Sequence, residues 1–335
     1  MRPMVICFPL LFVIACKDDP KATIAQTASE SFTQVPATAA DILWVVDNSI
    51  SMTEEQFKVM DGAQAFVDTF EDVGVDFHLG VVTTDVTAAH AEGGVLQGDT
   101  PYLTDADEDY VEQFQDRVDV GISGDDMESG LEAAVLALTE PNVSGVNAGF
   151  LRDDARLSII ILSDEDDCSD FGTVLSENQD EDNGGDCYSR IAELTPVADI
   201  VHMLQALKPD ASQIQLSGIV GQDDGICTTA QVGTRYIDAA ASIGGITGNI
   251  CAHDYARIMN DLGLVAAGMK VEFELTQEPV IATLEAWTHP ETGGDYEVFE
   301  DETNGWTYTS DPPMLTFHGE GVPARGSTLT ITYEY

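Results

Sequence analysis

The sequence contains four strand-length runs made mainly of apolar residues, the first of them continuous, and this pattern limits the available folds most strongly. A strand that is apolar on both sides must be buried on both sides, as happens in parallel sheets covered by helices. Stretches with apolar residues every three or four positions, typical of amphipathic helices, separate the runs. The strand candidates are residues 42–46, 77–82, 157–162 and 214–220. We therefore predict an α/β domain over residues 40–269 with a doubly wound, mostly parallel sheet.

The pattern changes after residue 269. From there to residue 335, short β-favouring runs alternate with turn sequences such as Asn304-Gly305. The last run alternates apolar and polar residues, so Leu329, Ile331 and Tyr333 would face the same side of a strand. These features predict a small β-sandwich-like module at residues 270–335.

The chain opens with a predicted targeting signal at residues 1–16. Arg2 precedes an apolar run of 12 residues, Met4 to Ala15. Such a run suits a secretory signal and is too short to cross a bilayer, which takes about 20 residues. It ends in Val13-Ile14-Ala15-Cys16, which resembles the lipobox where bacterial lipoproteins are cleaved and lipidated. The alternative is an ordinary signal peptide in which Cys16 is incidental.

The predicted anchor sets the expected location of the protein. Residues 17–39 are rich in Thr, Ser, Ala and Gln, which predicts a flexible tether. Lipid on Cys16 would hold the protein on a membrane without spanning it. Lys17 after the cysteine is compatible with sorting to the outer membrane. We expect a lipid-anchored protein of the cell envelope, on the periplasmic or the surface face.

The remaining cysteines predict disulfides. Of six cysteines, Cys7 would leave with the signal and Cys16 would carry lipid. An even number of the others in an exported chain favours disulfides, and no Cys-x-x-Cys spacing suggests zinc. Three pairings are formally open. The pairing that joins cysteines close in sequence is favoured, namely Cys168–Cys187 and Cys227–Cys251. Each of these bonds would stabilise the folded state by ~3 kcal/mol.

The charge of the chain restricts its partners. Thirteen basic residues stand against 60 acidic ones, for a net charge of −47. The acidic residues interleave with apolar runs along the whole chain, which indicates a folded protein with an acidic surface rather than an acidic tail. Such a surface repels nucleic acid and attracts cations. We therefore expect no nucleic-acid partner.

Oxygen-bearing side chains follow two of the predicted strands. Asp47 closes the first strand, Ser49 and Ser51 lie on the loop after it, and Asp164 closes the third strand. Ligands of open α/β sheets bind at such carboxyl ends, where two facing carboxylates would repel unless a cation lay between them. Carboxylate and hydroxyl oxygens suit Mg²⁺, Ca²⁺ or Mn²⁺, and we expect Mg²⁺ first. The alternative is that the two serines only cap the helix beginning near Thr53.

This pattern resembles the von Willebrand factor type A family over roughly residues 40–269. The metal-ion-dependent adhesion site of that family has Asp-x-Ser-x-Ser after the first strand, a threonine from a middle loop and an aspartate after the fourth strand. This chain has Asp47-x-Ser49-x-Ser51 and Asp164. The resemblance implies a metal whose coordination is completed by an acidic residue of a protein partner. The chain is also similar to exported bacterial lipoproteins that combine a lipobox, such a domain and a β-rich tail.

The sequence departs from the family at the threonine. The expected loop, residues 121–126, contains none. Ser123 could supply a hydroxyl instead, or Asp125 or Asp126 a carboxylate that would favour Ca²⁺ or tighter binding. A third carboxylate would reduce the need for a partner's acidic residue, so this departure bears on adhesion more than on the metal.

Three functions follow as hypotheses. The first is an envelope protein that binds a protein partner through a metal-bridged carboxylate. The second is a structural role, in which the metal and the disulfides only stabilise an acidic envelope domain. The third is a metal-dependent hydrolase. Because neither Gly-x-Ser-x-Gly nor His-Glu-x-x-His occurs and the six histidines are scattered, we expect that the protein is not an enzyme.

Overall fold

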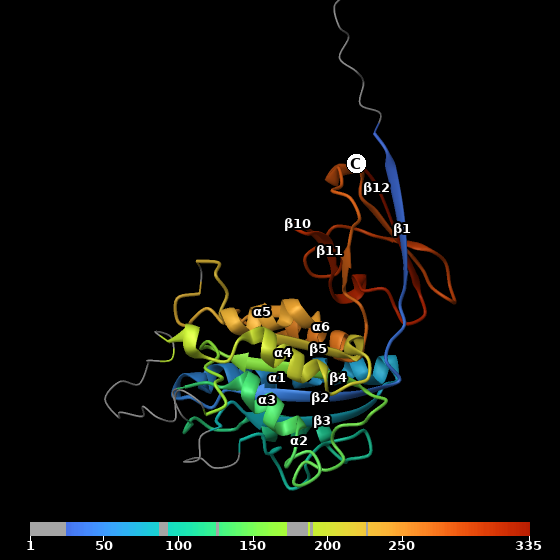
Figure 1. Cartoon of the computed structure of the whole chain (residues 1–335). Coiled ribbons are helices and arrows are strands. Elements are labelled where there is room, and N and C mark those ends of the chain that lie inside the picture. The colour runs from blue at the N-terminus through green and yellow to red at the C-terminus, as the bar shows by residue number, and fades with distance from the viewer. Residues whose placement is uncertain (1–24, 87–92, 125–126, 173–186, 188–189, 226) are drawn as a thin grey trace, which may run out of the picture.

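The computed structural model describes residues 25–86, 93–124, 127–172, 187, 190–225 and 227–335. The predicted signal peptide with Cys16, the start of the predicted tether and Asp125 lie outside these residues. Figure 1 shows a larger lobe of helices and strands and, beside it, a smaller lobe built mainly of strands. No helix within the described ranges combines the length and the apolar character needed to cross a membrane.

A parallel sheet of five strands forms the centre of the larger lobe. Its order is β3-β2-β4-β5-β6, and every neighbouring pair is parallel. The chain goes from β2 to β3 on one side and returns to β4 on the other, so the order reverses between β2 and β4. The strands are β2 (Ala39–Val46), β3 (Asp76–Thr83), β4 (Arg156–Ser163), β5 (Ile214–Val220) and β6 (Thr247–Asn249). The predicted α/β class with a parallel sheet is confirmed, since each of the four apolar runs lies in one strand.

Helices cover both faces of this sheet (Figure 1). Alternate residues of β2 point to opposite sides: Trp44 packs in the core formed with α1, α2 and α6, and Val45 in the core formed with α3, α4 and α5. The helices are α1 (Thr53–Val73), α2 (Tyr110–Val118), α3 (Gly130–Leu138), α4 (Val197–Gln205), α5 (Thr234–Ile243) and α6 (Ala256–Ala266). Short 3-10 helices lie at η1 (Ile50–Met52), η3 (Ile191–Glu193), η4 (Ala211–Gln213), η5 (Ile281–Thr283) and η6 (Gly319–Gly321).

Two antiparallel sheets form the smaller lobe. One has the order β1-β12-β8-β9 and the other β10-β11-β7, and their inner faces share one apolar core. The alternation predicted for the last strand is confirmed, because Leu329, Ile331 and Tyr333 are buried between less buried neighbours. The strands are β7 (Glu272–Glu274), β8 (Glu285–His289), β9 (Tyr296–Val298), β10 (Trp306–Ser310), β11 (Pro313–Phe317) and β12 (Thr328–Glu334).

The predicted tether is wrong for part of its length. Residues Thr27–Thr33 form β1, an edge strand that pairs antiparallel with β12 along its whole length. The strand was missed because Ala28 and Phe32 are its only apolar residues. It is held by backbone pairing and by contacts such as the hydrogen bond of the Tyr333 hydroxyl to Glu30 (2.5 Å). The smaller lobe therefore includes a segment that precedes the larger lobe in the sequence.

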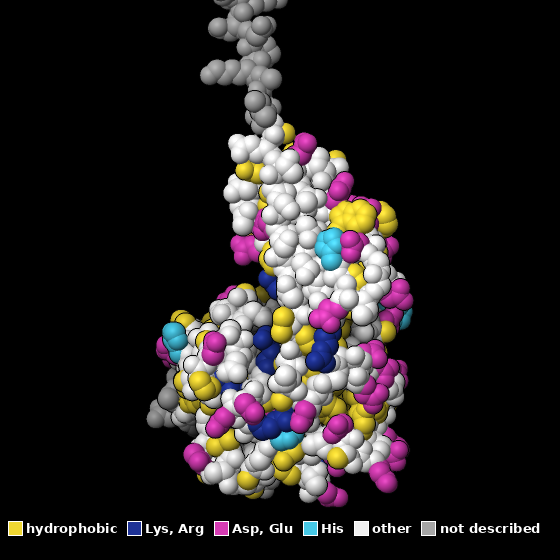
Figure 2. Space-filling model, turned by 90° about the vertical axis from the view of Figure 1, so that its right-hand side faces the viewer, with side chains coloured by type: hydrophobic (Ala, Val, Ile, Leu, Met, Phe, Trp, Pro, Cys, Tyr) yellow, Lys and Arg dark blue, Asp and Glu magenta, His cyan; other side chains and the backbone are white. Residues whose placement is uncertain are grey.

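The surface of the protein is acidic. On the face drawn in Figure 2, Asp and Glu side chains are spread over both lobes, while the few Lys and Arg side chains lie on the larger lobe and near the junction. Two basic residues of the larger lobe have a buried partner. At the amino end of β2, the buried Asp41 pairs with Arg152 (2.7 Å) and Lys208 (3.5 Å).

Candidate functional site

The candidate site lies at the carboxyl edge of the parallel sheet, where the strand order reverses between β2 and β4. The register pairs Val46 with Leu162, which brings Asp47 level with Ser163. The Ser163 hydroxyl donates to Asp47 Oδ2 at 2.7 Å, and Asp164 follows one residue later. A switch point of this kind is the usual ligand crevice of an open α/β sheet.

The loop after β2 brings the predicted residues together. The backbone N–H of Ser49 donates to Asp47 Oδ1 at 2.7 Å. The Oγ atoms of Ser49 and Ser51 are 3.1 Å apart, and the Ser51 hydroxyl donates to Asp164 Oδ1 at 3.1 Å. A continuous chain of hydrogen bonds therefore joins two strand ends that are 117 positions apart in the sequence.

The capping alternative is wrong for both serines. Neither η1 nor α1 has a hydrogen bond from a capping side chain at its first turn, although Ser49 occupies the N-cap position of η1. The Gln56 side chain instead donates to the carbonyls of Asp47 and Gly121, each at 2.9 Å. These bonds hold the first turn of α1 against both loops of the site. The serine hydroxyls remain directed at each other and at Asp164.

Glu128 is a further acidic residue of the site that the sequence did not indicate. It lies two residues before α3, is only 1% exposed, and accepts a hydrogen bond from the Thr84 hydroxyl through Oε2. Its Oε1 is buried and receives no hydrogen bond from the described residues. The nearby Asp47 carboxylate raises the pKa of Glu128, second only to burial as a cause. A cation or a shared proton would be needed to relieve this contact.

The carboxyl groups of the site are destabilised in their ionised form. Burial is the main cause of the raised pKa of Asp47, and it also raises the pKa of Glu128 well above the usual range. Burial and the charge of Asp47 together raise the pKa of Asp164 to about 6. Within the described part of the chain, no Lys or Arg pairs with these three groups, in contrast to Asp41 at the other end of β2.

The oxygen spacing fits a small divalent cation. In an octahedral shell at Mg²⁺–O distances of about 2.1 Å, adjacent ligands are about 3.0 Å apart. The measured distances are 3.1 Å for Ser49 Oγ to Ser51 Oγ and 3.1 Å for Ser51 Oγ to Asp164 Oδ1. Among the described His, Cys, Asp and Glu residues, no group of three or more is arranged to hold a metal by itself. A metal here would therefore need the serine hydroxyls as ligands.

Solvent reaches the cluster through a small cavity of about 210 Å³, which Ser51 and Asp164 line together with Glu54, Glu55 and Cys251. Burial is the largest cause of the raised pKa of Glu55, and the charge of Asp164 adds to it. The cavity offers an entry path for an ion, and its walls carry negative charge.

Of the residues considered as substitutes for the family's threonine, the structure describes only Ser123. Ser123 is exposed, and no hydrogen bond joins its side chain to the described residues of the cluster. Its neighbour Gly124 donates its backbone N–H to the Asn48 carbonyl at 2.8 Å, so the loop does border the site. Asp125 and Asp126 lie outside the described residues.

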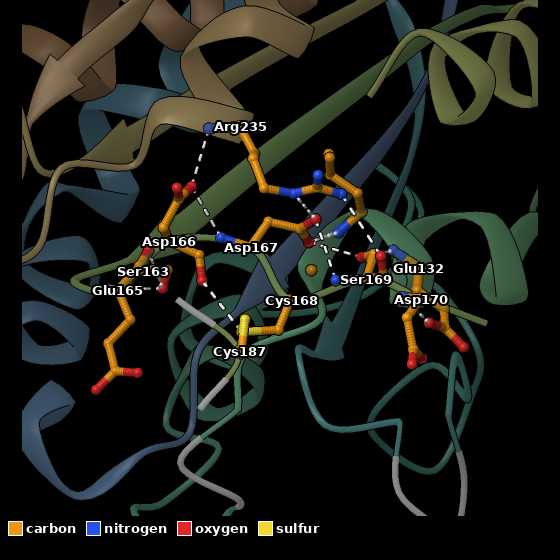
Figure 3. Close-up of a disulfide and its surroundings, with 12 residues drawn as sticks. Glu132, Ser163, Glu165, Asp166, Asp167, Cys168, Ser169, Asp170, Cys187 and Arg235 are labelled. Atoms are coloured by element: carbon orange, nitrogen blue, oxygen red, sulfur yellow. Dashed lines mark hydrogen bonds and ion pairs between the residues drawn. A yellow bond between two sulfur atoms is a disulfide. The ribbon is translucent and has the colours of Figure 1, made fainter. Parts of the chain in front are cut away.

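A buried polar network holds the loop that follows Asp164 (Figure 3). Asp167 Oδ2 accepts from Arg235 Nε at 3.0 Å, and Asp167 Oδ1 accepts from the Leu131 N–H at the start of α3. The Ser169 hydroxyl accepts from the Glu132 N–H at 2.8 Å. Through these contacts α5 and the amino end of α3 fix the loop that carries Asp164.

Both predicted disulfides are confirmed. Cys168–Cys187 lies in the same network, where the Cys168 N–H donates to the Glu128 carbonyl at 2.6 Å. Cys227–Cys251 closes a second loop near the cavity. One disulfide therefore supports the backbone of Glu128, and the other borders the entrance to the site.

Comparisons with known proteins give only distant likenesses. No family model and no curated protein matches the chain. Among solved structures, proximal thread matrix protein 1 from the mussel byssus is 17% identical, with a TM-score of 0.42 over 73% of this chain and 51% of that chain. The chain therefore spans about half the length of this mussel protein.

Two pilus adhesins are also similar over much of this chain. SpaC from Lactobacillus rhamnosus GG, in an open conformation, is 10% identical, with a TM-score of 0.42 over 92% of this chain and 40% of that chain. RrgA from Streptococcus pneumoniae is 9% identical, with a TM-score of 0.38 over 92% of this chain and 58% of that chain. At these scores the likenesses carry no argument about function.

Proposed function

We propose that the larger lobe is a von Willebrand factor type A-like domain that binds a divalent cation between Asp47, Ser49, Ser51 and Asp164. The observation that carries the proposal is the chain of hydrogen bonds from Asp47 through both serines to Asp164. The serines do not cap a helix, and their spacing matches adjacent ligands of Mg²⁺. Mg²⁺ is the ion we expect first, with Ca²⁺ or Mn²⁺ as alternatives.

Glu128 takes the place of the family's missing threonine in this proposal. It enters from the segment just before α3, and its buried Oε1 has no hydrogen-bond donor among the described residues. Its carboxylate adds negative charge next to Asp47, which favours a divalent ion and shifts the preference towards Ca²⁺. Ser123 and Asp125 are then not required as ligands.

The surface around the site supports a protein partner. Ile50 lies between the two serines and is 75% exposed, and Phe57, next to Gln56, is 56% exposed. Two more apolar residues lie next to the site. Ile122 follows Gly121, whose carbonyl accepts from the Gln56 side chain. Val232 follows Gln231, whose N–H donates to the Asp164 carbonyl at 2.8 Å. All four apolar side chains are exposed beside a polar cluster, as in protein-binding surfaces. We propose that the partner supplies an acidic residue to the metal.

Calorimetry tests the metal part of this proposal. We expect Mg²⁺, Ca²⁺ or Mn²⁺ to bind the purified chain at a ratio of one ion per chain, and Asp47→Ala to abolish that heat. A matched control is Asp295→Asn, which removes one charge from the smaller lobe. Equal heats for the wild type and Asp47→Ala would contradict the proposal.

A structural role is the second candidate, and Glu128 is the observation that favours it. A third carboxylate reduces the need for an acidic residue from a partner, so the ion could serve only the fold. A pull-down from envelope extract separates the two functions. A partner that is lost on chelation, and also lost in Ile50→Asp with metal binding intact, supports adhesion. Chelation that lowers the melting temperature and changes no partner supports the structural role.

We also propose that the protein is exported and anchored by lipid on Cys16. The proposal rests on the lipobox-like sequence Val13 to Cys16 and on the apolar run before it. Fractionation of cells that express the wild type and Cys16→Ala tests it. We expect the wild type in the membrane fraction and Cys16→Ala in the soluble fraction. Membrane association of both proteins would exclude the anchor.

A further inference from the structure

A second cavity, with a volume of about 570 Å³, lies between the two lobes. Helices α5 and α6 and the edge strand β6 line it from the larger lobe, and β7 and β11 line it from the smaller lobe. It shares no residue with the oxygen cluster at the carboxyl edge of the sheet. Its volume lies within the range of small-molecule sites, which are often found between domains.

A buried histidine–aspartate pair forms the polar part of this cavity. Asp261 of α6 is 6% exposed and His318, which follows β11, is 8% exposed. Thr307 fixes the ring through a hydrogen bond at 2.9 Å to His318 Nε2. The other ring nitrogen, Nδ1, is 3.5 Å from Asp261 Oδ2 and makes no hydrogen bond.

Asp261 Oδ1 also receives no hydrogen bond from the described residues. Even a hydrogen on His318 Nδ1 that pointed at Asp261 Oδ2 would leave Oδ1 without a donor among the described residues. Buried polar atoms without a partner are uncommon in folded proteins and ask for an explanation. A ligand that donates hydrogen bonds into the cavity would supply one.

The other charged residues of the cavity make it attractive to cations. Glu272 of β7 and Asp254 also line it, against the single guanidinium of Arg257. Arg257 donates through Nη1 to the Glu302 carbonyl at 3.3 Å and has no carboxylate partner among the described residues. Burial raises the pKa of Glu272, although His318 and Lys270 oppose this. An added positive charge would stabilise the ionised form of Glu272.

Apolar side chains form much of the remaining wall. Ile246 and Ile258 contribute from the larger lobe, and Met314 and Phe317 from β11. The cavity thus combines an acceptor-rich, negatively charged end with an aliphatic and aromatic wall. This combination suits a ligand with a cationic donor group on a short apolar chain.

We propose that the cavity between α6 and β11 binds an organic cation, with its ammonium or guanidinium group at Asp261 and Glu272. The carboxylates accept its N–H donors, and Ile258 and Met314 pack against its aliphatic part. A free amine and the side chain of a partner's Lys or Arg share this chemistry. A metal ion is disfavoured because the described carboxylates and His318 are not arranged as a metal site.

A chemical-shift titration of the ¹⁵N-labelled full chain tests the proposal. The probes are n-butylammonium, n-butylguanidinium and the neutral n-butanol. We expect both cations to shift resonances around Asp261 and His318 with a dissociation constant on the order of 1 mM, and n-butanol to shift none of them. The tripeptide Gly-Lys-Gly with blocked ends distinguishes the sources: tighter binding than n-butylammonium indicates a partner's side chain, and binding of n-butylammonium alone indicates a free amine.

Two variants and one control complete the test. Asp261→Asn should weaken binding of the cations about tenfold or more, because a charge-assisted hydrogen bond is lost. Glu272→Gln, at the half-buried rim, should weaken it several-fold and serves as the measurement if Asp261→Asn does not fold. Asp295→Asn, which removes an exposed carboxylate that pairs with His289 at 3.1 Å, should leave binding unchanged. Equal binding of n-butanol and n-butylammonium, or unchanged affinity in Glu272→Gln, would overturn the proposal.

Discussion

Replacing Asp164 by Asn should stabilise the protein without metal and remove its response to metal. The Asp164 carboxyl has a pKa of about 6 in the folded chain because of burial and the charge of Asp47. Its ionisation at pH 7.5 therefore costs the native state up to ~3 kcal/mol relative to an ordinary Asp. Asn removes this cost and can still accept the hydrogen bond from Ser51. For a domain of this size, ~3 kcal/mol corresponds to a rise in melting temperature of roughly 6–12 °C.

Added metal should make the wild type more stable than Asp164→Asn. A ligand at a thousandfold excess over its dissociation constant stabilises the folded state by about 4 kcal/mol. The wild type should gain this stabilisation and overtake Asp164→Asn, which lacks a charged ligand and should gain little.

The pH dependence follows from the direction of the shift. Since the folded pKa of Asp164 is raised, its favourable contribution is complete at pH values below the usual Asp pKa and is lost as the pH rises through about 6. Between pH 5 and 7.5, the metal-free wild type should lose more stability than Asp164→Asn. The stabilisation by metal should instead decrease as the pH falls below 6, because protons then compete with the metal for the carboxylates.

Thermal unfolding of the two proteins, with chelator and with Mg²⁺ or Ca²⁺, measures these effects. Asp295→Asn is the control for loss of a single charge on this acidic chain. A variant Asp164→Asn that is less stable than the wild type in chelator, with an equal response of both proteins to metal, would contradict these expectations. That result would mean that Asp164 contributes only ordinary hydrogen bonds.

Three further predictions concern single features of the structure. Ser51→Ala should weaken metal binding in calorimetry by about tenfold or more, yet change metal-free stability by less than about 1 kcal/mol, because Ser51 caps no helix. Arg235→Met should cost ~3–5 kcal/mol in denaturant unfolding, because it leaves the buried Asp167 without its ion pair, while Arg190→Ala in the partly exposed pair with Glu193 should cost less, ~1 kcal/mol. Removing Cys227–Cys251 by substituting both residues with Ser should cost ~3 kcal/mol, from the loop of sequence separation 24 that it closes. A loss below about 1 kcal/mol would indicate a loop that is ordered without the bond.

The sequence predicted the parts of the fold in which each element has its own apolar pattern. Strands β2, β3, β4 and β5 carry mainly apolar residues because helices cover both faces of the sheet, so each was visible as a mainly apolar run. Helix α5 was missed because small alanines and the buried Arg235 and Tyr236 make up its buried face, which weakens the apolar spacing. Strand β6 was missed because Thr247–Asn249 contains no large apolar residue. Pairing with a neighbour, rather than local sequence, defines such elements.

The candidate site was predicted as far as residues follow directly from strand ends. Asp47, Ser49, Ser51 and Asp164 come together because parallel strands end at one edge of the sheet. Ser163 could have been recognised as a hydrogen-bond partner of Asp47 only from the register of β2 against β4, which sets the two residues level. Glu128 lies before α3, and its contacts with Thr84 and Asp47, which come from two other strand ends, were not predicted. An acidic residue just before a highly apolar helix is a signal that could have marked it.

The most direct test of the metal site is a crystal structure of the chain grown with Mn²⁺, with data collected for anomalous scattering. We expect one strong anomalous peak within coordination distance of Ser49 Oγ, Ser51 Oγ and the Asp164 carboxylate, with Glu128 and Asp47 turned towards it. A map without a peak at this position, in crystals that hold Mn²⁺ elsewhere, would contradict the account.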